Sequence, residues 1–196
     1  MTEGPLPGSF LPDRHTFRLE LTYPHPPGRV WRALTEPEHL AAWFMPLELD
    51  LRVGGRAVLV DYGQLEGTPP AEGIVTAVEP ERLLEYRFPS GPWEWPPCTL
   101  RFELQEEDGR CRLVFSQQLS PDFVPTWRDF DRFQIGGPGT HLPGACAGWQ
   151  GFFEEGLSRF LEGRVTDIYG DDDDRLMDER SERYEPLVRA ASVHQD

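Results

Sequence analysis

The chain has 196 residues and a formal net charge of −15 at pH 7, a length at which a single domain buries a substantial core. The negative charge argues against a nucleic-acid partner, because phosphate binding requires a basic surface. The chain has 19 arginines but neither lysine nor asparagine, which is typical of a GC-rich bacterial genome.

The sequence contains no apolar run of membrane-spanning length and no apolar run at its N-terminus, so we expect a cytoplasmic protein without a membrane partner. Its three cysteines are too few, and odd in number, for a secreted disulfide framework. Either Cys98 and Cys111 oppose each other across a hairpin, or these two and Cys146 are all reduced core thiols. The histidines show no metal-ligand spacing, so the sequence predicts neither a metal nor a cofactor.

In chain order, residues 1–13 are rich in glycine and proline and are expected to form a flexible N-terminal arm. The first strand is predicted at 15–23, where apolar residues alternate with polar ones. The apolar positions are Phe17, Leu19, Leu21 and Tyr23.

From Arg29 to Phe44 the pattern predicts two short helices with a break at 35–37. We expect Thr35 to cap the second helix through its hydroxyl. Pro37 suits the first turn of that helix, because the amide that proline lacks would have no partner there.

The strand-like alternation returns several times after the helices, which predicts an antiparallel sheet with one wet face and one covered face. A Glu-Asp-Gly turn signal at 107–109 predicts a hairpin between the last two strands. The apolar positions are Leu47, Leu49, Leu51 and Val53; Leu84, Tyr86 and Phe88; Leu100, Phe102 and Leu104; and Cys111, Leu113 and Phe115.

A helix predicted from about 145 to 163 supplies the cover for this sheet. Its apolar residues recur at spacings of three and four and form one broad stripe. We expect Gly163 to end the helix. The stripe consists of Trp149, Phe152, Phe153, Leu157, Phe160 and Leu161.

The segments before and after this helix show neither the alternation of a strand nor the apolar stripe of a covering helix. Residues 120–144 are long for a connection, and ordered loops of this length often act as lids. After residue 165, an acidic run at 171–174 precedes a charged stretch that is compatible with a helix. This C-terminal extension, 165–196, is either a solvated appendage or an arm that binds a protein partner.

Several of these motifs resemble a known superfamily, the SRPBCC proteins, also called START-like or helix-grip proteins. Within it, the chain is most similar to the family of homologues of the Hsp90 ATPase activator C-terminal domain. The likeness covers residues 14–164 and rests on the helical break (Val30 to Thr35, Pro37, Leu40, Trp43 and Phe44), on Gly54-Gly55, on the run from Gly73 to Leu83, and on Gly148-Trp149.

The resemblance implies an α+β helix-grip fold of the START or Bet v 1 type. In this fold a curved antiparallel sheet wraps around a long C-terminal helix, and two short helices lie between the first and second strands. Sheet and helix commonly enclose an apolar cavity, which is the general form of a small-molecule site.

The candidate ligand-binding residues are mostly aromatic side chains on the surfaces and loops that would face this cavity. The alternative is that they simply fill the core, as large aromatic side chains usually do. The candidates are Trp43, Phe44, Tyr62, Tyr86, Phe88, Trp93, Phe102, Phe115, Phe130, Phe133, His141, Trp149 and Phe153.

The favoured function is binding of a small hydrophobic or aromatic ligand in this cavity. No nucleophile elbow, phosphate loop or dinucleotide fingerprint occurs, so no catalytic residue is assigned. The first alternative is an enzyme of the polyketide cyclase or aromatase type, which needs polar groups in the cavity. The available groups are Asp61, Arg87, Gln117 and His141.

A second alternative is a chaperone-cofactor-like protein that binds a protein partner through the C-terminal extension. Trp93 and Trp95 lie in a segment with four prolines, 89–97, and rigid aromatic area of this kind suits either the mouth of a pocket or a homodimer contact.

Overall fold

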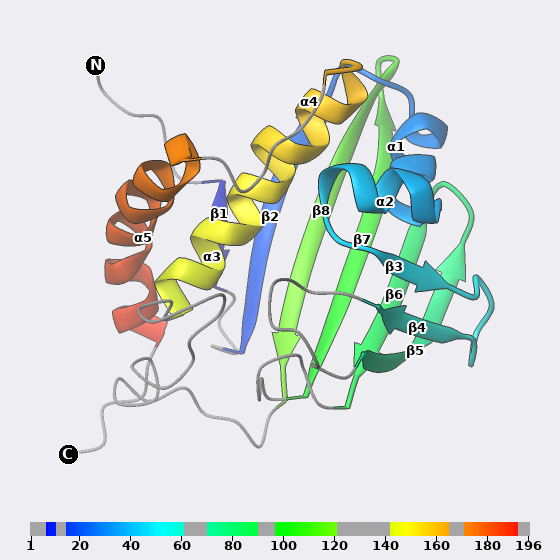
Figure 1. Ribbon diagram of the computed structural model, residues 1–196, viewed down its shortest axis with the longest axis horizontal. Coiled ribbons are helices and arrows are strands. Elements are labelled where there is room, and N and C mark those ends of the chain that lie inside the picture. The colour runs from blue at the N-terminus through cyan, green and yellow to red at the C-terminus, as the bar shows by residue number, and fades with distance from the viewer. Residues whose placement is uncertain are drawn as a thin grey trace.

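The computed structural model describes residues 7–10, 15–60, 70–89, 97–120, 142–164 and 171–191. Within these ranges eight strands form one antiparallel sheet in the order β1-β2-β8-β7-β6-β5-β4-β3, and a long helix crosses one of its faces (Figure 1). This arrangement confirms the predicted α+β helix-grip fold.

The strands are β1 (Gly8–Phe10), β2 (Thr16–Tyr23), β3 (Leu47–Leu49), β4 (Arg56–Leu59), β5 (Ala71–Glu79), β6 (Leu83–Phe88), β7 (Cys98–Glu107) and β8 (Arg110–Leu119). The helices are α1 (Pro27–Thr35), α2 (Pro37–Trp43), α3 (Leu142–Gly151), α4 (Ser158–Leu161) and α5 (Asp171–Ala191). A π-helical segment, Phe152–Leu157, joins α3 to α4.

Strand β1 lies within the segment that was expected to be a flexible arm. Its residues pair with β2, and Gly8 lies opposite Leu19. The two short helices therefore follow the second strand of the sheet rather than the first. A strand of three residues is too short for its alternation of apolar and polar side chains to be recognised in the sequence.

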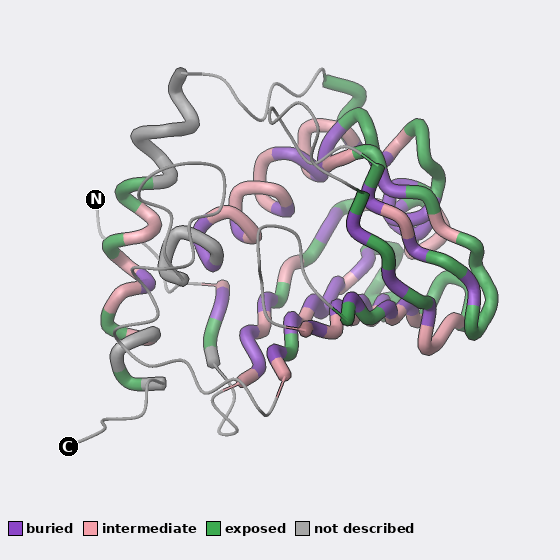
Figure 2. Tube along the Cα trace, turned by 60° about the horizontal axis from the view of Figure 1, so that its bottom comes forward, coloured by how far each residue is buried: buried purple, intermediate pink, exposed green. Residues whose placement is uncertain are grey.

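The apolar residues of the predicted alternation lie on the concave face of the sheet. Figure 2 shows buried and less buried positions alternating along the strands. Side chains in register across four strands form one continuous layer, because directly paired residues share a face. One such row consists of Leu84, Phe102, Phe115 and Leu19, each at most 4 % exposed.

The alternation predicted from Leu47 to Val53 is only partly strand. β3 ends at Leu49, and Leu51 and Val53 are 40 % and 65 % exposed. The chain turns here because Gly54 has a positive φ of 81° and a Cβ at Gly55 would lie 2.0 Å from the carbonyl oxygen of Asp50. Backbone geometry therefore overrides the side-chain pattern at the β3–β4 turn.

The predicted hairpin between β7 and β8 is present. Asp108 and Gly109 have φ values of 52° and 78°, which is the pair of positive angles that a type I′ turn requires. Cys98 and Cys111 lie at opposite ends of this hairpin, paired with Leu119 and Glu106 respectively. All three cysteines are free and buried, so they are core thiols rather than a disulfide.

The expectation that Thr35 caps the second helix is wrong. Its hydroxyl donates to the carbonyl oxygen of Trp31 at 2.8 Å, inside α1, and the residue that precedes α2 is Glu36. Pro37 does open α2, as predicted. Thr35 is buried, so a bond within its own helix satisfies its hydroxyl without reaching toward the next one.

The long cover helix runs from Leu142 to Leu161 and is slightly longer at its start than predicted. Gly163, with φ 74°, ends it. Its middle turns are π-helical, which widens the helix and leaves backbone groups that need other partners. The carbonyl oxygen of Phe153 accepts one hydrogen bond from the Tyr23 hydroxyl at 2.9 Å and another from the Ser158 hydroxyl at 3.3 Å.

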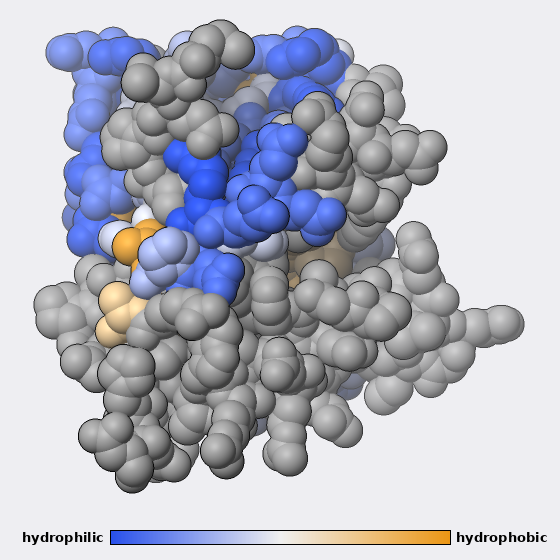
Figure 3. Space-filling view, turned by 90° about the vertical axis from the view of Figure 1, so that its left-hand side faces the viewer, coloured by the Kyte–Doolittle hydropathy of each residue, from blue (hydrophilic) through white to orange (hydrophobic). Residues whose placement is uncertain are grey.

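The C-terminal extension folds back onto the domain through α5, which contacts α3 and β1 (Figure 1). Tyr184 on α5 is fully buried and meets Phe17 edge to face, with ring centroids 5.5 Å apart. On the side of the molecule where α5 lies, the described surface is mostly hydrophilic (Figure 3). This helix is therefore an outer layer with one packed face, and not a solvated appendage.

Candidate functional site

A small cavity lies where α2, the concave face of the sheet and the cover helix meet. Its volume is about 10 Å³, which is close to the space that one water molecule needs. The walls are almost entirely apolar and come from α1, α2, two strands and the cover helix. The lining residues are Leu34, Leu40, Trp43, Phe44, Tyr86, Phe102, Trp149 and Phe153.

Three aromatic rings pack between the end of α2 and the cover helix, and we call them the aromatic gate: Phe44, Trp149 and Phe152. Phe44 stacks on Trp149 at a centroid distance of 5.7 Å and meets Phe152 edge to face at 4.9 Å. Trp149 and Phe152 are only partly buried, whereas the deeper rings Trp43 and Phe153 are 2 % and 0 % exposed. Trp149 is thus the most exposed residue of the cavity wall, and Phe152 packs against it and Phe44 from outside the wall.

One pair of polar side chains lies inside this aromatic environment. The indole Nε1–H of Trp149 donates to the amide oxygen Oε1 of Gln117 at 2.9 Å. Gln117 is 4 % exposed and comes from β8, so the pair joins the cover helix to the sheet. We call it the Trp149–Gln117 pair.

Two weakly acidic groups lie close to this pair. Burial raises the pKa of the Cys98 thiol from its ordinary value of 9.0 to about 11, and a side-chain hydrogen bond with Gln117 partly opposes that rise. Burial also raises the pKa of the Tyr86 hydroxyl well above its ordinary value, with a smaller contribution from Cys98. Both groups are therefore uncharged at neutral pH, as are all the lining residues.

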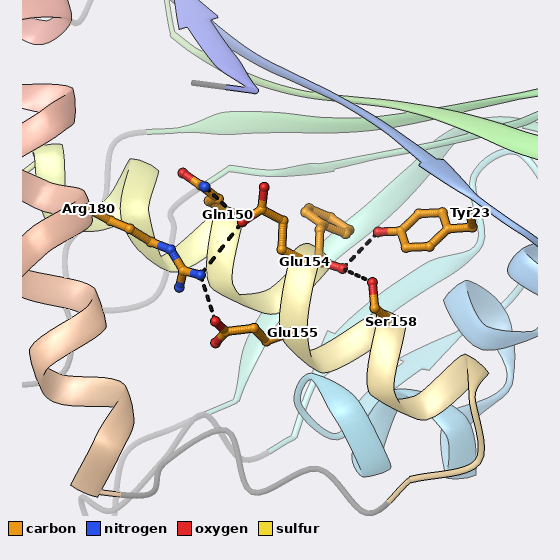
Figure 4. A network of polar contacts seen from close by, with 7 residues as sticks. Tyr23, Gln150, Glu154, Glu155, Ser158 and Arg180 are labelled. Atoms are coloured by element: carbon orange, nitrogen blue, oxygen red, sulfur yellow. Dashed lines mark hydrogen bonds and ion pairs between the residues drawn. The ribbon is translucent and has the colours of Figure 1, made fainter. Parts of the chain in front are cut away.

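A second polar network lies on the opposite side of the π-helical segment and is drawn in Figure 4. Arg180 of α5 donates to Glu155 at 2.7 Å, and its guanidinium lies 3.6 Å from the carboxylate of Glu154. Glu154 also accepts a hydrogen bond from the amide nitrogen of Gln150 at 2.8 Å. The segment that carries Phe153 into the cavity wall is thus tied on its outer side to the C-terminal helix.

Six of the sequence-derived candidates surround the cavity: Trp43, Phe44, Tyr86, Phe102, Trp149 and Phe153. Two more lie directly behind this wall. Phe115 packs on Trp149 at a centroid distance of 4.5 Å, and Phe88 packs on Tyr86 at 5.8 Å. The remaining candidates, Tyr62, Trp93, Phe130, Phe133 and His141, lie outside the described residues.

Among the polar groups considered for an enzyme, only Gln117 is seen near the cavity. Arg87 is exposed on the outer face of β6, and Asp61 and His141 lie outside the described residues. Sequence reasoning missed Leu34 and Leu40 as lining residues. Their helices were predicted, but nothing in the sequence indicated that the buried side of these helices would reach the cavity.

Within the described ranges, no three histidine, cysteine or acidic side chains are grouped closely enough to hold a metal ion. The same part of the chain contains no helix with the length and apolar character that a membrane crossing demands.

A sheet that grips a long helix around an aromatic cavity defines a helix-grip protein of the SRPBCC superfamily. More specifically, the family described as Activator of Hsp90 ATPase homolog 1-like protein matches residues 24–162, and the chain belongs to this family. No curated protein matches the chain in sequence.

Solved structures with the same fold include the crystal structure of CalU16 from Micromonospora echinospora. It is 23 % identical with a TM-score of 0.61, and the match covers 88 % of each chain. EF2215 from Enterococcus faecalis, a conserved protein of unknown function, is 20 % identical with a TM-score of 0.62 over 92 % of this chain and 90 % of that one. DynU16, from the dynemicin biosynthetic locus, is 25 % identical with a TM-score of 0.57 over 77 % of this chain and 49 % of that one.

Proposed function

We propose that this protein binds a small hydrophobic or aromatic molecule between the sheet and the cover helix. The observation that supports the proposal is a void of about 10 Å³ at the point where eight side chains from the sheet, the two short helices with Phe44 after them, and the cover helix converge. Its walls are apolar apart from the Tyr86 hydroxyl and the Trp149 indole N–H, which matches the general composition of small-molecule sites.

The cavity volume of about 10 Å³ admits no molecule larger than water, so ligand entry requires side chains to move. The aromatic gate is the part that moves in this proposal, because Trp149 and Phe152 are half-buried and less enclosed than the rings behind them. The ligand then replaces contacts that the gate rings make with one another.

Binding is favoured over catalysis of the cyclase type. A proton-transfer mechanism needs an acid or a base with a pKa near the working pH. Among the described residues, Tyr86 lines the cavity and Cys98 lies near it, and burial raises the pKa of both. The similarity to DynU16, a protein of a biosynthetic locus, is compatible with either a carrier or an enzyme.

The first test is native mass spectrometry of freshly purified protein, followed by denaturing extraction of any released small molecule. The purified protein is then titrated with the uncharged fluorescent probe N-phenyl-1-naphthylamine. We expect a defined adduct or saturable probe binding that Trp149→Ala abolishes.

The matched control is Trp31→Ala, which removes a buried indole from α1 that does not line the cavity. If probe binding falls equally in both variants, the loss reflects stability and not the site. A bare protein mass together with no saturable probe binding would refute the proposed function.

A further inference from the structure

The Trp149–Gln117 pair is the feature that says most about the chemistry of a ligand. The donor belongs to a lining residue, Trp149, and it meets its acceptor on Gln117 at 2.9 Å. Apart from the Tyr86 hydroxyl, the other lining side chains are apolar. Trp149 belongs to the aromatic gate, so any ligand that displaces the gate separates the indole N–H from its acceptor. Both groups then need new partners, because an unpaired buried polar group is costly.

A hydroxyl group satisfies both members of the pair at once. Its oxygen accepts from the Nε1–H of Trp149, and its hydrogen is donated to Oε1 of Gln117. An ether or ketone oxygen can accept from Trp149 but leaves the Gln117 oxygen unpaired. In the structure the Gln117 oxygen is directed at the Trp149 indole N–H.

The surroundings of the Trp149–Gln117 pair also favour an uncharged ligand over a charged one. None of the lining residues among the described parts of the chain carries a charge, and Gln117 is 4 % exposed. A carboxylate placed here would face the lone pairs of the Gln117 oxygen without a compensating cation, and burying an unpaired charge is strongly unfavourable.

The walls favour a planar ring system. Phe44 and Trp149 stack with an interplanar angle of 23°, and Tyr86 and Phe102 stack at 29° on the sheet side. A flat aromatic molecule can take the place of one ring in such a stacked pair and replace the ring-to-ring contact with its own.

We propose that the ligand of this cavity is an uncharged hydroxylated aromatic compound whose hydroxyl group inserts into the Trp149–Gln117 pair. This inference rests on the proposed function and names the class of ligand for the same site. It assigns Gln117 as the acceptor and Trp149 as the donor that together determine specificity.

The test compares four compounds of one ring system by displacement of N-phenyl-1-naphthylamine from the full chain at pH 7. They are 2-naphthol, 2-methoxynaphthalene, naphthalene and 2-naphthoate. We expect 2-naphthol to bind about tenfold more tightly than 2-methoxynaphthalene or naphthalene, which is the effect of one well-placed hydrogen bond. We expect 2-naphthoate to bind most weakly of the four.

The decisive variant is the double substitution Gln117→Met with Trp149→Phe. It replaces both partners by apolar side chains of similar shape, so neither is left unpaired and the fold is retained. The double variant should lose the preference for 2-naphthol while it still binds naphthalene. Trp31→Phe is the matched control, and it should keep the preference.

The outcomes separate the two proposals. If the probe and all four compounds fail to bind, the proposed function is wrong and the inference falls with it. If naphthalene or 2-methoxynaphthalene binds as tightly as 2-naphthol, the site exists but the assigned ligand class is wrong. The same conclusion follows if the double variant keeps the preference for 2-naphthol.

Discussion

Two buried tyrosines provide a sharp test of the packing described above, because one identical change should have opposite effects at the two positions. The hydroxyl of Tyr23 donates to the carbonyl oxygen of Phe153 at 2.9 Å. The hydroxyl of Tyr184 is buried and has no hydrogen-bond partner among the described residues. Substitution by phenylalanine removes only the hydroxyl in each case.

At Tyr23 the change removes a buried hydrogen bond, which costs about 1 kcal/mol of the free energy of unfolding. The cost stays at this level because the Phe153 carbonyl keeps its second hydrogen bond, from Ser158 at 3.3 Å. At Tyr184 the change removes a polar group that folding desolvates without compensation, so Tyr184→Phe should leave the stability unchanged or raise it by up to about 1 kcal/mol.

The assay is urea unfolding of the two variants and the wild type, followed by circular dichroism, with thermal melting as a second measure. For a domain of this size, a change of 1 kcal/mol moves the melting temperature by about 2–4 °C. The difference between the variants should be about 1–2 kcal/mol. If Tyr184→Phe is as destabilising as Tyr23→Phe, the docking of α5 described above is wrong.

Three further predictions concern other parts of the molecule. Arg180→Ala should lower the free energy of unfolding by about 2 kcal/mol, because it leaves the partly buried Glu155 without its charged partner. The control is Arg82→Ala on the exposed surface, which should change the free energy of unfolding by less than about 0.5 kcal/mol. Chemical unfolding measures both values. Gly55→Ala should cost about 1–3 kcal/mol in the same measurement, since the added Cβ collides with a backbone carbonyl, and an unchanged midpoint would contradict the turn geometry. Stability should fall as the pH rises from about 9 to about 11, because burial raises the pKa of both the Cys98 and the Cys111 thiol to about 11, so folding disfavours their thiolates. Cys98 contributes about 3 kcal/mol at most, so Cys98→Ala should make the fall shallower by that amount without removing it.

Local patterns in the sequence predicted β2, β6, β7, β8, the two short helices and the cover helix, and the family resemblance supplied the fold. The period-two alternation places Phe102 and Phe115 on the covered face, and the i, i+4 spacing of Phe153, Leu157 and Leu161 places them on the buried stripe of the cover helix. These signals are reliable because each residue's side is fixed by the geometry of its own element. Four of the six aromatic candidates that surround the cavity came from this reasoning, and Trp43 and Phe44 came from the helical break that carries the family resemblance.

Features that depend on contacts between distant segments were decided only by the tertiary structure. The π-helical segment has no local signature in the sequence, and the Tyr23 hydroxyl that supports it lies 130 residues away in the chain. The docking of α5 likewise depends on Arg180 and Tyr184 finding partners on other elements.

The cavity shows most clearly which features the sequence predicted and which only the tertiary structure decided. The family resemblance implied a cavity, and the positions of the aromatic side chains predicted most of its lining, but its size of about 10 Å³ results from how tightly those side chains interlock. The pairing of Trp149 with Gln117 also required the structure, because the two residues come from different elements and meet only when the helix lies on the sheet. The sequence thus determined which side chains face inward, while packing between elements decided how much space they leave and which polar groups meet there.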